Sequence, residues 1–95
     1  MNRYPPRAFD EAIDKLPKHM RLGVKLWIEE GVPGGHFLMA VMANDFKEVF
    51  MRADKTNLAV LADWVNFLQN HAPIGCQGNR EKIKAWKGLM NPVDT

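Results

Sequence analysis

The sequence predicts an all-α protein, a compact bundle of four to five short helices. Apolar residues recur at helical spacing in several blocks, no segment shows the alternation of a half-buried strand, and Gly, Pro and Asn residues separate the blocks. The connections between blocks are short, so consecutive helices are expected to pack as neighbours. The 95 residues are interpreted as one domain, with a weakly structured segment at 1–15 and a helical core at 16–90.

Three predicted helices occupy the first half of the chain. Residues 8–15 are expected to form one or two turns, because the prolines before them hold the chain extended. Residues 17–30 have the pattern of an amphipathic helix that begins at Pro17 and stops at Gly31 in the left-handed conformation. After a short connection, residues 36–52 are expected to form one central helix, since apolar side chains fill a broad face along its whole length.

Two more helices are predicted in the second half. Asp54 or Thr56 can cap a helix that continues to residue 71, just before Ala72-Pro73. Asn79 is the expected N-cap of the last helix, residues 80–89. The predicted core is built from the large aromatic residues Trp27, Phe46, Phe50, Trp64, Phe67 and Trp86.

Composition and charge exclude several classes of protein without selecting a function. Hydrophobic residues make up 46% and charged residues 25%, which does not fit a disordered tail. The longest apolar stretch, 37–43, is far shorter than the about twenty residues of a bilayer span. A formal charge of +2 does not by itself argue for nucleic acid. Cys76 is the single cysteine and residues 1–9 lack the apolar run of a signal peptide, so a cytoplasmic location is expected.

No residue pattern points to catalysis or to a metal. The three histidines never share a helix at i, i+4, and Cys76 has no second cysteine at ligand spacing. His71 and Cys76 are five residues apart across Pro73, which gives no positioned base and nucleophile. We therefore expect no enzyme activity, no cofactor and no metal site.

Polar residues around the predicted central helix are the leading candidates for binding. Asp45 and Arg52 are seven residues apart on one helix edge, which indicates either capping and ion pairing or an edge that meets a partner. The Gly-Gly-His run before this helix is either a plain interhelical turn or a place where free N–H groups approach an anion. The predicted partner- or ligand-binding residues are Gly34, Gly35, His36, Asn44, Asp45, Arg52 and Asn57.

A basic cluster near the C-terminus predicts an alternative function. Only Glu81 counters its charge, so the cluster is either a solvated helix face or a contact for phosphates. Association with nucleic acid would use Arg80, Lys82, Lys84, Lys87 and Trp86.

Short runs between residues 16 and 86 carry a resemblance to known sequences: Leu16-Pro17-Lys18-His19-Met20, Gly31-Val32-Pro33, Phe37-Leu38, Ala40-Val41, Asn44-Asp45, Arg52-Ala53-Asp54, Asn57, Ala72-Pro73 and Gly75-Cys76. On these residues the chain resembles a group of small accessory proteins of tailed phages and prophages that have no assigned activity. The resemblance implies a compact product that acts by stoichiometric binding in the cytoplasm of a host cell. Its target would be a host immune protein or a nucleotide signal in counter-defence, or a replication or recombination factor. In the alternative function, the protein would itself be an accessory of replication, recombination or transcription that associates with nucleic acid through the basic C-terminal helix.

A homo-oligomer is also expected, on physical grounds. A bundle of 95 residues gains stability by burying a second apolar face against another copy. No membrane partner is expected.

Overall fold

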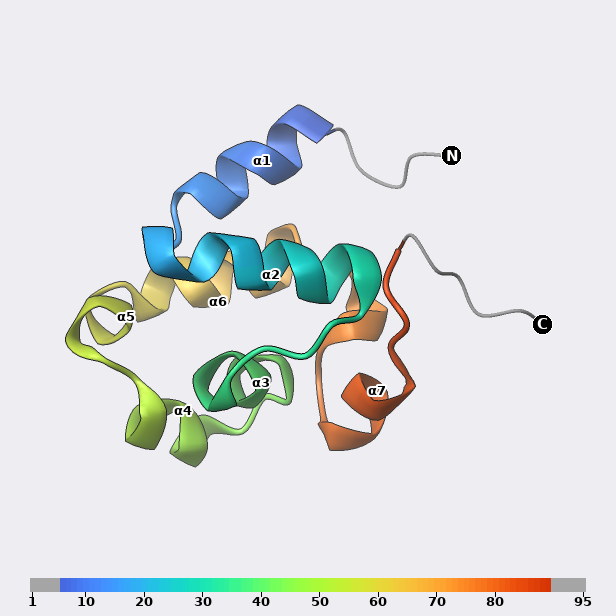
Figure 1. Ribbon diagram of the computed structural model, residues 1–95. Coiled ribbons are helices and arrows are strands. Elements are labelled where there is room, and N and C mark those ends of the chain that lie inside the picture. The colour runs from blue at the N-terminus through green and yellow to red at the C-terminus, as the bar shows by residue number, and fades with distance from the viewer. Residues whose placement is uncertain (1–5, 90–95) are drawn as a thin grey trace.

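The computed structural model describes the backbone of residues 6–89 and the side chains of residues 10–89, and this part of the chain is all-α (Figure 1). It contains seven α-helices, one 3₁₀ helix and no strand. The elements are α1 (Pro6–Asp14), α2 (Lys18–Glu30), α3 (His36–Met42), α4 (Phe46–Arg52), α5 (Lys55–Ala59), α6 (Leu61–Asn70), η1 (Ile74–Cys76) and α7 (Arg80–Ala85).

The core lies between α2, α3 and α6. Val24 and Ile28 of α2 are fully buried, and Trp64 and Phe67 of α6 are each 1% exposed. The rings of Phe37 and Trp64 meet edge to face, with centroids 5.5 Å apart, and join α3 to α6. The predicted core positions of Trp27, Trp64 and Phe67 are therefore confirmed, while Trp86 is half-buried.

Helix α1 runs above α2, and its second half is part of the core (Figure 1). Ala12 and Ile13 are buried together with Leu16, which follows the helix. The structure therefore shows a nine-residue helix where the sequence predicted one or two turns.

Most of the predicted helix ends are confirmed. Gly31 ends α2 with φ at +72°, Asp54 caps α5 through the backbone N–H of Asn57, and Asn79 caps α7 through that of Lys82. Each of these signals acts within a few residues of the helix end, so the local sequence is sufficient to predict it.

The prediction of one central helix over 36–52 is wrong. The chain breaks after α3, where Asn44 adopts a left-handed conformation with φ at +58°. The N–H of Asn44 donates to the carbonyl of Val41 at 3.1 Å and that of Asp45 to the carbonyl of Ala40 at 2.9 Å, which is a Schellman motif. Apolar residues continue at helical spacing on both sides of this break, so the periodicity does not predict it. Because the chain changes direction there, Phe46 and Phe50 leave the predicted core and are 73% and 49% exposed.

Two other helix boundaries also differ from the prediction. The helix expected to continue to residue 71 is interrupted at Val60, where φ is −120°, so that α5 and α6 are separate. The last helix ends at Ala85, and Trp86 is extended because its indole is held against α2.

Candidate binding surface on helix α4

Asp45 fixes the start of α4 and joins it to α7. Its Oδ1 accepts the backbone N–H of Glu48 at 3.3 Å, and its Oδ2 accepts a guanidinium N–H of Arg80 at 2.9 Å. The hydrogen bond from Arg80 and the capping bond hold the pKa of Asp45 below its ordinary value of 3.8. Asp45 is therefore both the N-cap of α4 and the ion-pair partner of Arg80.

A polar flank of α4 is formed by Glu48 and Arg52, with Asp45 and Asn44 at its start. Arg52 donates to Glu48 at 3.2 Å across one helical turn, and about half of the Arg52 side chain is exposed. Exposed ion pairs contribute little to stability. These side chains can therefore exchange their present partners for those of another molecule at small cost.

An apolar flank of α4 faces the other way. Phe46 and Phe50 are one turn apart, and their rings meet edge to face with centroids 4.9 Å apart. None of the seven residues of α4 is buried. The helix therefore presents its largest apolar side chains to solvent.

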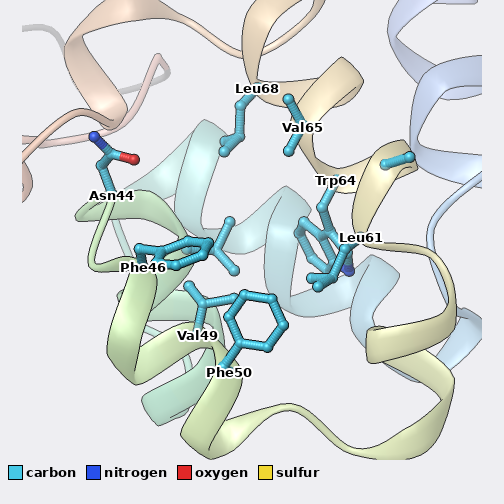
Figure 2. Close-up of a pocket in the computed structure, with 10 residues that line it drawn as sticks. Asn44, Phe46, Val49, Phe50, Leu61, Trp64, Val65 and Leu68 are labelled. Atoms are coloured by element: carbon cyan, nitrogen blue, oxygen red, sulfur yellow. The ribbon is translucent and has the colours of Figure 1, made fainter.

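A hollow of about 320 Å³ separates this apolar flank from α6, and we call it the α4–α6 groove (Figure 2). Phe46 and Phe50 form one wall, Val65 and Leu68 of α6 form the opposite wall, and Trp64 lies deeper. Asn44 lies at one end and is the only predicted site residue that lines this hollow. All residues that line it are uncharged. The apolar periodicity did not predict the groove, although the Asn44-Asp45 pair, which precedes α4, is a turn signal.

Asn57 is placed where it cannot contact a partner directly. It is 2% exposed, and its Oδ1 accepts the indole N–H of Trp64 at 3.0 Å in the core. Its role in the described structure is to satisfy a buried donor.

The predicted binding residues Gly34, Gly35 and His36 are exposed at the start of α3, whereas Asn44 follows its end. Seven helical residues separate the two places, a length of about 10 Å. The structure therefore does not bring all the predicted residues into one site. It groups Asn44 with Asp45 and, along α4, with Arg52.

The residues predicted to contact nucleic acid differ in how exposed they are and in whether they already have a partner within the protein. Arg80 pairs with Asp45, and the indole N–H of Trp86 donates to the carbonyl of Trp27 at 2.7 Å. Lys84 and Lys87 are exposed, whereas Lys82 is half-buried. Only part of the cluster is therefore free to contact phosphates.

Cys76 is fully buried, and burial raises the pKa of its thiol to about 12. Among the described residues there is no group of three or more His, Cys, Asp or Glu that could hold a metal ion. In the same part of the chain, every helix is too short or too polar to cross a membrane.

Comparisons with known proteins found no matching family model, no similar curated protein and no similar solved structure.

Proposed function

We propose that the protein is a non-enzymatic binding protein that acts by occupying a host component, with the polar flank of α4 as its contact surface. The observation that carries this proposal is that α4 buries none of its residues and presents Asp45, Glu48 and Arg52 in exposed ion pairs, next to the exposed Asn44. A helix of seven residues is not stable on its own and contributes little to the core, which favours a role in recognition.

The host component is proposed from the resemblance to phage accessory proteins. In that setting, binding would block a host immune protein or sequester a nucleotide signal in the host cytoplasm. The guanidinium of Arg52 suits either target, because it can donate two hydrogen bonds to a carboxylate or to a phosphate.

The proposal is tested by affinity capture from a bacterial extract with the immobilised protein. Arg52→Ala is expected to abolish capture of the bound component while leaving helical content and the melting temperature nearly unchanged. Lys84→Ala, which removes an exposed positive charge from α7, serves as the matched control and should retain capture. Equal capture by wild type and Arg52→Ala would refute the polar flank as the contact surface.

A second measurement separates the two kinds of target. Native mass spectrometry of the protein with a panel of cyclic and linear nucleotides would reveal a retained nucleotide as an added mass. We expect Arg52→Ala to lose that mass if the target is a nucleotide, and neither protein to carry it if the target is a host protein.

The exposed side chains of Lys84 and Lys87 favour association with nucleic acid as a second candidate function. Such binding would weaken by about one power of salt concentration for each phosphate contact. Lys84→Ala would then lower the affinity for DNA, and Arg52→Ala would serve as the control.

A further inference from the structure

Phe46 and Phe50, the largest side chains on the apolar flank of α4, are exposed to solvent, whereas Val49 of the same flank packs partly against the core. Their rings meet edge to face and form one wall of the α4–α6 groove. Val65, on the opposite wall, is 59% exposed. A helix of this length depends on packing for its stability, so a partner that covers these residues would also stabilise α4.

The chemistry of the groove selects an uncharged, apolar partner. Every residue that lines it is uncharged, and Asn44 supplies the one polar side chain. A nucleotide or a nucleic acid would find no opposite charge among these residues. Two copies of the same chain can meet here without bringing like charges into the contact.

The exposed apolar area is about three quarters of what a standard homodimer interface buries. An aromatic side chain presents on the order of 200 Å², so Phe46 at 73% and Phe50 at 49% exposure leave about 240 Å² open. Val65 and the partly exposed leucines raise this to about 400 Å², within the range of functional surface patches. A standard interface takes about 800 Å² from each partner, and about 65% of a homodimer interface is apolar, which is about 520 Å².

We propose that the α4–α6 groove is covered by a second copy of this chain in a two-fold symmetric dimer. Each copy offers both a protruding side chain, Phe46, and a hollow of about 320 Å³ beside it. A two-fold axis brings each protrusion to the hollow of the other copy, which is the complementarity that an isologous interface requires. Glu48 and Arg52, on the opposite flank of α4, stay outside this contact. The dimer therefore goes beyond the proposed host binding and does not depend on it.

The test is the mass of the full chain in solution, measured by light scattering after size-exclusion chromatography. The wild type is expected at about twice the 10.9 kDa of one chain, with the mass falling on dilution. Phe46→Glu is expected to halve the mass, because it places a charge in an apolar contact. The fold should tolerate this change, since Phe46 is 73% exposed, and circular dichroism of the variant verifies it.

Met51→Glu is the matched control, because Met51 is also on α4 and 66% exposed but does not line the groove. This variant should keep the dimer mass. Val65→Glu, on the other wall, should lose it like Phe46→Glu. In about 1 M sodium chloride, where charges are screened beyond about 3 Å, the wild-type dimer should persist.

A monomeric wild type at high protein concentration would overturn the proposal. So would a folded Phe46→Glu variant that keeps the dimer mass, or a Met51→Glu variant that loses it. Loss of the dimer with retained capture of a host component would separate the two proposals, because that capture uses the polar flank of α4 and neither Phe46 nor Val65.

Discussion

The indole N–H of Trp86 donates to the backbone carbonyl oxygen of Trp27 at 2.7 Å, although the two residues are 59 positions apart. The indole N–H of Trp27 donates in turn to the carbonyl oxygen of Cys76 at 3.0 Å. These two bonds attach η1 and the segment after α7 to α2. The last helix stops at Ala85, and the bond from the next residue, Trp86, holds that indole against α2.

The two tryptophans are expected to differ in their effect on stability. Trp27→Phe should lower the free energy of unfolding by about 3 kcal/mol, because it leaves a void and a carbonyl without its donor. Trp86→Phe should cost about 1 kcal/mol, since the carbonyl of Trp27 still accepts the N–H of Gly31 at 3.0 Å. Urea denaturation measures both, and equal losses would contradict this order.

Substitution of Asn57 tests whether this residue stabilises the fold or contacts a partner. Asn57→Ala leaves the buried indole N–H of Trp64 unpaired and should cost about 2 to 3 kcal/mol in free energy of unfolding. The control is Asn66→Ala, which removes an exposed amide that accepts from Asn70 and should change stability by less than about 0.5 kcal/mol. An Asn57→Ala variant that keeps its stability but no longer captures the partner would contradict this structural role and show that Asn57 contacts the partner.

The sequence was sufficient to predict the fold class and the helix ends that depend on local chemistry. Gly31, Asp54 and Asn79 end or begin helices through bonds to residues no more than five positions away. The breaks at Asn44 and Val60 were missed because apolar residues continue at helical spacing on both sides of each.

The candidate site could be predicted only in part. The Glu48–Arg52 pair follows from its i, i+4 spacing, whereas the Asp45–Arg80 pair joins residues 35 positions apart and depends on how α7 packs. The groove depends on the direction of α4 after the turn at Asn44, which periodicity does not encode.

Gly31 and Gly35 provide a contrast between two glycines near one connection. A Cβ at Gly31 would lie 2.7 Å from the backbone of Lys87. The φ of Gly31 is +72°, a backbone conformation that residues other than glycine rarely adopt. Gly31→Ala should therefore cost at least about 1 kcal/mol. Gly35 has open space around it, and its alanine variant should stay within about 0.5 kcal/mol, because a poorer N-cap is offset by a stiffer unfolded chain. Thermal melts of the two variants test this, and similar losses would contradict it.

Cys76 should resist thiol reagents in the folded protein. The thiol is fully buried, and burial raises its pKa to about 12, so very little thiolate forms near neutral pH. Labelling by iodoacetamide at about pH 8, near the ordinary thiol pKa, should proceed only as fast as the protein opens, and denaturant should accelerate it. Fast labelling without denaturant would show that the thiol is accessible, and Cys76→Ser verifies that the label is on this residue.

Stability should fall in acid because two helix caps titrate. The pKa of Asp45 is held down by Arg80 and the N–H of Glu48, and that of Asp54 by the N–H of Asn57 and by His19. A carboxylate whose folded pKa is lowered contributes stability above its unfolded value of 3.8, and this contribution is lost as the pH falls through the folded pKa. Asp45→Asn and Asp54→Asn keep a capping oxygen without the titration, so the double variant should lose less stability than wild type below about pH 4. Arg80→Ala removes the hydrogen bond that contributes most to the lowered pKa of Asp45 and leaves Asp54 unchanged. It should therefore weaken the acid dependence of stability less than the double variant does. Urea midpoints measured across this pH range test the prediction, and an unchanged acid dependence in the double variant would assign it to other groups.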